Sequence, residues 1–332
     1  MTKRMNQSLN ARRKTKRHGF TLIELLVVIS IITLLVGILT PGIRIFKKAS
    51  DGLKQKSRFH AMEIGLELFQ KDYTEYPESN PLGDSSNGYV YGAQHLAEAL
   101  AGRDKKGFDP KTDWYAPLND EELYSNSDDD QIIKKSLARR RGPYIDLNDA
   151  DIYEPAQLYD SLGNMYSGDP PDYDSSPPSP VFTDVFYKKK ITTIITDSSG
   201  NQEEVKVRVG TPVLYFKAKS SSRYFRENED DPATSFDETD ETRWIYNYDD
   251  NYGLFQLEVI KDPAEMHRYN ESYTYPDGRP PREHFYEDIT NPNVESNDPD
   301  YYRPYNARTF ILMSAGWDGI FGTNDDITSF NY

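Results

Sequence analysis

The chain has 332 residues, of which 36% are hydrophobic, and a formal net charge of −15; this length suffices for a membrane segment and one or two modest domains. Seven of its 39 Lys and Arg lie in residues 1–18, where there is no acid, so the other 32 face all 54 Asp and Glu. Such an acid excess repels phosphate backbones and argues against nucleic acid as a ligand. The absence of cysteine excludes disulfides, thiolate metal sites and thiol redox chemistry.

The first predicted element is a membrane-spanning helix over residues 20–43, directly after the basic leader 1–19. Its only charge is Glu24, and at about 1.5 Å per residue it can cross a hydrocarbon layer of roughly 30 Å. The basic leader should keep the N-terminus in the cytoplasm and place the residues after about 45 on the far side. No Ala-x-Ala-like site follows the apolar run, so a cleaved secretory signal is disfavoured. A carboxylate inside such a span is costly and points to a function.

Residues 44–76 predict an amphipathic continuation of this helix. Apolar side chains recur at spacings of three and four, among them Phe59, Met62, Leu66 and Phe69. We therefore expect one helix over residues 20–74, whose second half packs on a globular head. Pro77 should end it, and Pro41 with Gly42 should kink or locally melt it.

Residues 77–332 predict an extracytoplasmic head. A short helix is expected over residues 93–100, and another within 120–141 between an acidic and a basic run, which we interpret as a solvated helix rather than a docking patch. Strands are predicted at residues 181–187, 191–196, 205–209, 213–218, 244–248, 254–260 and 309–313. This order predicts an α+β fold, in which the long N-terminal helix packs on a small antiparallel sheet.

Three long loops are expected in the head, over residues 166–180, 220–242 and 262–306. The loop 220–242 is acidic, whereas 166–180 and 262–306 are rich in Pro, Asp and Tyr. Their tyrosines could form an adhesive surface. We favour the alternative that they are self-packing insertions, in which buried tyrosines compensate for a thin core.

The C-terminal loop, residues 314–328, carries Asp318, Asp325 and Asp326 together with three glycines. Calcium prefers six to eight oxygen ligands, and glycine lets the backbone fold around an ion. The carboxylate ladder and closing Glu of an EF-hand are missing. On these residues alone the loop is either a calcium site or a plain Asp-Gly turn.

The residues Gly19-Phe20-Thr21-Leu22-Ile23-Glu24 resemble the prepilin peptidase motif of type IV pilins and type II secretion pseudopilins. The resemblance implies that the leader is removed between Gly19 and Phe20 and that Phe20 is N-methylated. It also implies that Glu24 meets the Phe20 amine of a neighbouring subunit within a filament. Pro41 matches the helix-kinking proline of the family. A plain signal anchor with a chance Glu is the alternative.

The C-terminal loop resembles that of the major, G-type pseudopilins, in which calcium replaces the disulfide of true pilins. Asp318 and Asp325 match the side-chain ligands best, with Asp326 third, and the lack of cysteine agrees. The resemblance implies a structural Ca²⁺ that ties the last strand and loop onto the head. The central residues depart from that family, because the head of a major pseudopilin is much smaller.

The function that the resemblance implies is that of a structural filament subunit. Its partners would be prepilin peptidase, other copies of itself, minor pseudopilins, an inner-membrane assembly platform and membrane lipid. It would lie in the bacterial inner membrane as a single-pass protein, with its head in the periplasm, before assembly into a type II secretion-type pseudopilus or type IV-like filament. The main alternative is a minor pilin or surface adhesin that binds through Tyr-rich loops. A membrane-anchored hydrolase is remote, because the sequence contains no His-Glu-x-x-His, phosphate loop or Gly-x-Ser-x-Gly motif, and we expect no catalytic residue.

Overall fold

The computed structural model describes residues 20–114, 123–124, 130–148, 150–167, 178–196, 202–222, 244–294 and 303–330. It divides into two units, residues 1–49 and residues 50–332. The predicted leader 1–19, most of the expected loops 166–180 and 220–242, and the acidic run before residue 130 lie outside the described residues.

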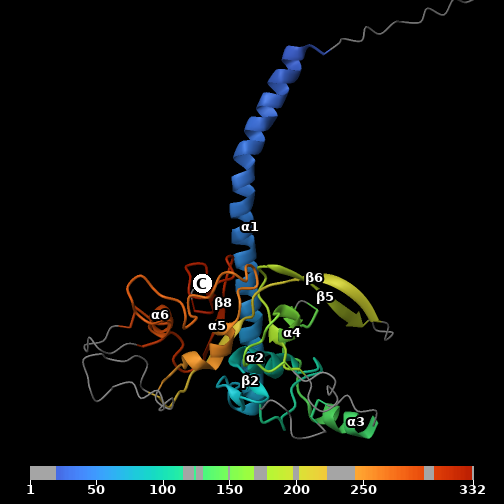
Figure 1. Cartoon of the computed structure of the whole chain (residues 1–332). Coiled ribbons are helices and arrows are strands. Elements are labelled where there is room, and N and C mark those ends of the chain that lie inside the picture. The colour runs from blue at the N-terminus through green and yellow to red at the C-terminus, as the bar shows by residue number, and fades with distance from the viewer. Residues whose placement is uncertain are drawn as a thin grey trace, which may run out of the picture. The chain divides into compact units, whose positions relative to one another are not determined.

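Helix α1, Leu22–Tyr73, runs through both units (Figure 1), which confirms the helix expected over residues 20–74. It is long and apolar enough, by length and composition, to cross a membrane. The helix is continuous through Pro41 and Gly42, so the expected local melting is wrong. A proline removes a single hydrogen bond from the ladder, and the apolar residues on both sides continue the helix. The helix ends where Thr74 adopts a positive φ of 69°.

In the second unit, the buried face of α1 packs on α2, Gly92–Ala101, and on the central sheet. Phe59, Met62 and Leu66 are fully buried there, as their spacing predicted. Gly65 permits the close approach of α2, because a Cβ at this position would lie 3.0 Å from Leu100 Cδ2 and from the Tyr144 carbonyl. Leu53, by contrast, is 70% exposed, so the apolar stripe meets the head only after that residue.

The described strands pair in four small antiparallel sheets, which confirms the α+β class. Strand β8, Phe310–Ser314, lies between β7, Leu214–Lys217, and β9, Ile327–Thr328, and is buried along its whole length. The other sheets are two-stranded: β1, Leu82–Asp84, with β2, Gly88–Val90; β3, Ile152–Tyr153, with β4, Val181–Phe182; and β5, Lys189–Thr196, with β6, Gln202–Val209. The strand expected at 181–187 is thus limited to its first two residues.

Several short helices lie where strands or loops were expected. The strands predicted at 244–248 and 254–260 are wrong, because this segment forms η2, Tyr248–Asn251, and α5, Tyr252–Gln256. The expected loop 262–306 contains α6, Pro281–Asp288. The remaining helices are α3, Asp130–Arg139, which was expected, and α4, Pro155–Leu158.

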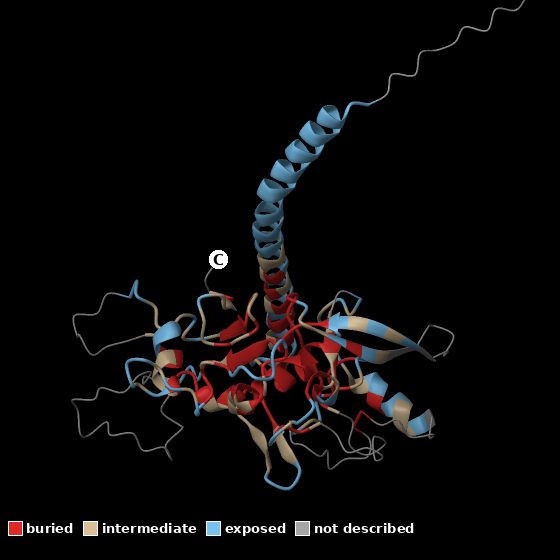
Figure 2. Ribbon diagram, turned by 45° about the horizontal axis from the view of Figure 1, so that its top comes forward, coloured by how far each residue is buried: buried red, intermediate tan, exposed pale blue. Residues whose placement is uncertain are grey.

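Aromatic side chains contribute ten of the 26 buried residues in the main core of the second unit; buried residues are red in Figure 2. Tyr246, Tyr248 and Tyr269 are buried and pack with Phe255 and Phe285. Tyr248 places its ring centroid 5.0 Å from that of Phe255 and 5.7 Å from that of Phe285. Of these tyrosines only Tyr269 lies in an expected loop, 262–306, and for that residue the interpretation of a self-packing tyrosine is confirmed.

Candidate functional site

The first site is the N-terminus of α1, where Thr21 and Glu24 cap each other. Because α1 begins at Leu22, Thr21 is the N-cap residue and Glu24 is the third residue of the helix. The Thr21 backbone N–H and hydroxyl both donate to Glu24 Oε2, at 2.8 Å each, and the Glu24 N–H donates to Thr21 Oγ1 at 3.3 Å. This reciprocal arrangement is a capping box, which satisfies N–H groups that the helix itself leaves unpaired.

The capping box explains how an isolated chain holds a carboxylate at this position. The Glu24 charge lies at the positive end of the helix dipole, and one of its oxygens is fixed by Thr21. Glu24 Oε1 has no hydrogen-bond partner among the residues that the structure describes. Phe20, just before the cap, is 73% exposed, and Gly19 lies outside the described residues. The site therefore presents one carboxylate oxygen to a second partner.

The second site is the loop between β8 and β9, which holds the three predicted aspartates. Asp318 accepts hydrogen bonds from the Ile320 N–H at 2.9 Å and from Thr323 Oγ1 at 2.8 Å. Asp326 Oδ2 accepts from the Gly322 N–H at 2.8 Å. At Gly316, with a φ of +62°, a Cβ would lie 1.9 Å from the Asp325 carbonyl, so only glycine lets the two ends of this loop meet.

The loop fits a cation in two respects. Asp326 Oδ1 is buried and has no hydrogen-bond partner in the described structure, and burial raises the pKa of Asp326 well above its ordinary value. The Trp317 carbonyl already accepts a hydrogen bond from a cation, the Lys188 ammonium. Burial lowers the pKa of Lys188 to about 8, and the negative charges of Asp184, Asp318 and Asp325 partly offset this effect. Among the described residues, however, no three acidic or His side chains come together closely enough to hold a metal. Any ion would need backbone carbonyls as further ligands.

A buried imidazole ties this loop to the rest of the head. His267 Nδ1 accepts from the Phe321 N–H at 3.1 Å, and the Arg268 N–H donates to the Phe321 carbonyl at 2.8 Å. The ring centroids of His267 and Phe321 lie 4.9 Å apart. Burial lowers the pKa of His267 to about 3, so the ring remains the neutral acceptor that this hydrogen bond requires.

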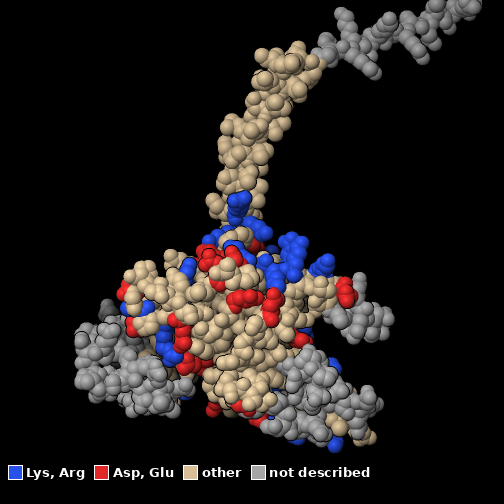
Figure 3. Space-filling model, viewed as in Figure 1, with Lys and Arg blue, Asp and Glu red and all other residues tan. Residues whose placement is uncertain are grey.

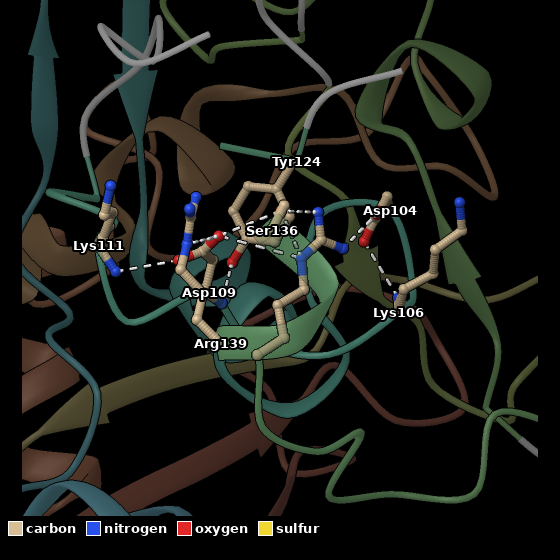
Figure 4. Close-up of polar contacts among 8 residues, drawn as sticks. Asp104, Lys106, Asp109, Lys111, Tyr124, Ser136 and Arg139 are labelled. Carbon is tan, nitrogen blue, oxygen red and sulfur yellow. Dashed lines mark hydrogen bonds and ion pairs between the residues drawn. The ribbon is translucent and has the colours of Figure 1, made fainter. Parts of the chain in front are cut away.

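Arg139 and Arg140, at the end of α3, belong to a partly buried ionic network (Figure 4), whereas Lys134, Lys135 and Arg141 are exposed, as expected for a solvated helix. Arg139 Nε donates to both oxygens of Asp109, at 2.7 and 2.8 Å, and the Asp109 side chain is fully buried. Arg140 binds Asp104 at 2.5 Å and lies over the ring of Tyr124. The acids are thus neutralised by arginines, and the network holds α3 against the segment that follows α2.

Sequence reasoning found Glu24 and the three aspartates but missed the residues that act on them. Thr21 could have been found, since Thr-x-x-Glu at the start of an apolar run is a capping-box signature. Lys188 and His267 carry no such signal, because they reach the C-terminal loop only through the fold. Pro41 lies within α1, remote in sequence from both sites.

Comparison with known proteins gives matches at the N-terminus. The prokaryotic N-terminal methylation motif matches residues 14–40. The type II secretion system core protein G of Escherichia coli (strain K12) is 37% identical over 65 residues, which are 20% of this chain and 45% of that protein. The chain thus spans less than half the length of this curated relative. No solved structure matches.

The methylation motif matches residues 14–40, which include the capped Glu24 and the apolar first part of α1. By length and composition, α1 is suited to crossing a membrane. Over the matched residues, this chain is therefore similar to the prokaryotic N-terminal methylation motif and to a type II secretion system core protein G.

Proposed function

We propose that the chain is a filament subunit that is cut between Gly19 and Phe20, is methylated on Phe20, and polymerises through α1. The hydrogen bonding of the Glu24 carboxylate is the observation that supports this proposal. Thr21 holds one carboxylate oxygen at 2.8 Å, while Oε1 has no partner in the described structure. A cut after Gly19 would create an amine on Phe20, four residues from this carboxylate.

A charge needs a partner when helices bundle away from water. An unpaired carboxylate is costly in an apolar environment, and its removal from a buried pair is more harmful than replacement of the whole pair. The Phe20 amine of a neighbouring copy would neutralise Glu24 and fix the axial register of adjacent helices, the best-supported role of a buried polar pair. The exposed apolar side chains of residues 22–43 would then exchange lipid for neighbouring helices.

The partners in this proposal are prepilin peptidase, further copies of the chain, minor pseudopilins and an inner-membrane assembly platform. The chain would lie in the inner membrane with its N-terminus in the cytoplasm and its head in the periplasm, and then in a pseudopilus that serves protein secretion. An adhesive role through exposed tyrosines is less well supported, because Tyr246, Tyr248, Tyr269 and Tyr286 are buried. No catalytic role is proposed.

We further propose that the C-terminal loop binds a structural calcium ion. Asp318 and Asp325 would supply carboxylate oxygens and the Trp317 carbonyl a backbone oxygen. Because the three aspartates do not come together in the described structure, the loop would have to close on the ion before Asp326 could bind it through Oδ1, which is buried and has no hydrogen-bond partner among the described residues. Because Lys188 places its ammonium on the Trp317 carbonyl, calcium would have to displace it. The bound ion would fix the loop between β8 and β9.

The proposal is tested by Glu24→Ala in cells that contain an active prepilin peptidase. We expect the intact mass of the membrane-extracted protein to show a chain that begins at Phe20 and carries one additional methyl group, for both the wild type and the variant. Filaments, seen by electron microscopy and by crosslinking between copies, should be lost or misregistered in the variant. The reason is that the Phe20 amine would be left without its counter-charge.

Thr21→Ala is the matched control, since it removes the cap within the chain but keeps the carboxylate. We expect it to retain filaments that Glu24→Ala loses. Normal filaments from Glu24→Ala would refute the pairing, and a wild-type chain that begins at Met1 would refute the processing.

A further inference from the structure

The β5–β6 hairpin presents a positively charged face to solvent. Its register places Lys190 directly opposite Arg208, and Thr192 opposite Lys206. All four residues are exposed. Glu204 follows on the same face, two residues nearer the tip, so the positive charge is concentrated at the root of the hairpin.

These three cations are unbalanced within the described part of the chain. Lys190, Lys206 and Arg208 make no ion pair with any residue that the structure describes, whereas the neighbouring Lys189 binds Asp160 at 3.3 Å. Like charges directly opposite each other on a sheet are destabilising. In a chain with 54 acids, such a cluster costs stability unless an anionic partner offsets it.

The root of the hairpin is fixed to α1 shortly after the apolar span. The Val185 N–H donates to Gln55 Oε1 at 3.0 Å, and Arg58 donates to the Thr183 carbonyl at 3.0 Å. The charge of Asp51 also acts on Tyr187, three residues before Lys190. Along a helix, Asp51 follows Ile43 by only about 12 Å. Figure 3 shows exposed Lys and Arg side chains on one face of the second unit.

We propose that the basic face of the β5–β6 hairpin, Lys190, Lys206 and Arg208, binds anionic phospholipid headgroups of the membrane that α1 crosses. The inference rests on the proposed membrane anchor. Cations close to an anionic bilayer are attracted within a Debye length, about 8 Å at physiological ionic strength, and the guanidinium of arginine matches phosphate in a bidentate manner. Because few residues separate the apolar span from Gln55 and Arg58, which hold this hairpin, the chain path is short enough for the face to reach the headgroups. It would hold the head on the membrane before assembly.

The test uses the full chain in vesicles. Because the chain lacks cysteine, T192C gives a single site for an environment-sensitive fluorophore in the middle of the face. Vesicles of POPC alone are compared with three parts POPC to one part POPG, at high lipid excess. In the POPG vesicles we expect the quenching constant for acrylamide, a neutral quencher, to fall at least about threefold. The effect should disappear near 1 M salt, where the Debye length is about 3 Å.

Two charge-reversed variants provide the comparison, both carrying T192C. K190E/K206E/R208E should abolish the POPG effect, whereas K106E/K134E/K135E, with the same change of net charge, should retain it. If the chain floats with both kinds of vesicle but is quenched equally in both, the proposed lipid contact is overturned while the membrane anchor is not. A chain that floats with neither vesicle contradicts the membrane anchor and the proposal together. Protection from acrylamide that does not depend on POPG but increases with the protein-to-lipid ratio would overturn the lipid contact. It would identify a second copy of the chain as the partner of this face.

Discussion

At the scale of single residues, the residues of the candidate sites are oriented by direct hydrogen bonds. Thr21 holds Glu24, and His267 holds the backbone of Phe321. The two cases differ in their response to acid, because the imidazole must remain neutral to accept a hydrogen bond. Burial lowers the pKa of both His95 and His267 to about 3. The folded head therefore stays unprotonated at these rings where the unfolded chain takes up protons.

The first prediction concerns the pH dependence of stability. Because folding depresses the pKa of these imidazoles, their contribution is complete above about pH 6.5 and is lost as the pH falls toward about 3, at about 1.4 kcal/mol per pH unit for each ring. His267→Asn keeps an acceptor near the Nδ1 position and removes the titration. We expect its free energy of unfolding, measured in urea at about pH 7 and about pH 5, to fall with acid less steeply by about one such increment.

His60→Asn is the control for this measurement, since the His60 side chain is 73% exposed. Because this side chain is exposed, the substitution should change the free energy of unfolding at about pH 7 by no more than about 0.5 kcal/mol. A slope for His267→Asn equal to that of the wild type would show that the native head does not exclude the proton at this ring.

At the scale of elements, hydrophobic periodicity correctly predicted the elements that the local sequence determines. It failed for elements whose secondary structure depends on tertiary packing. The apolar spacing of Phe59, Met62 and Leu66 correctly placed the second half of α1 on the head. The apolar run of 254–260 was misread as a strand, because a run this short does not distinguish a strand from a buried helix. Pro281 at the first position of α6 is a helix-start signal, but the polar, Pro-rich surroundings concealed it.

The candidate sites divide in the same way. Glu24 and the aspartates of the C-terminal loop are visible as local motifs, and the Thr21 cap is too. The Lys188 contact with Trp317 joins residues 129 positions apart, and the ion pair of Asp109 with Arg139 spans 30. Contacts of this kind follow from the assembled fold, so no local pattern predicts them.

The network at α3 supports a prediction at this scale. Asp109 is fully buried and Arg139 is 18% exposed, so Asp109→Asn removes a carboxylate that binds a largely buried guanidinium. Loss of one partner of a buried pair costs about 3 kcal/mol, and we expect that loss to appear first in α3. Hydrogen exchange should show reduced protection of the α3 amides in the variant, with α2 much less affected.

The double variant Asp109→Asn with Arg139→Gln separates pairing from packing. If the ion pair holds α3, the double variant should be more stable than the sum of the two single changes predicts, by about 1–3 kcal/mol. Additive losses would assign the role of these residues to packing alone.

At the scale of the whole molecule, the second unit combines an acidic surface with a core spread over four small sheets. It has no cysteine to crosslink its last strand, and β9 contributes only two residues to the central sheet. The loop before β9 therefore determines how firmly the C-terminus is held. An ion bound only by the folded loop stabilises the whole unit by mass action, about 2.7 kcal/mol at a hundredfold excess over its Kd.

The corresponding prediction is that calcium raises the melting temperature of the wild-type head by about 5–10 °C relative to chelator. Asp318→Ala with Asp325→Ala should abolish that difference while changing the melting temperature in chelator much less. The control is Asp146→Ala with Asp262→Ala, which removes the same charge and two turns of the same kind, with N–H to Oδ1 distances of 2.9 and 3.1 Å. This pair should retain the full calcium response.

Near-UV circular dichroism of the aromatic core follows the transition in all three proteins.

Removal of the competing ammonium by Lys188→Gln should increase the calcium affinity, because the Trp317 carbonyl is then released to the ion. A wild-type head whose melting temperature is the same in calcium and in chelator would mean that the loop is a plain Asp-Gly turn. In that case the Lys188 ammonium, already seated on the Trp317 carbonyl and acted on by the charges of Asp318 and Asp325, is the cation that this loop uses.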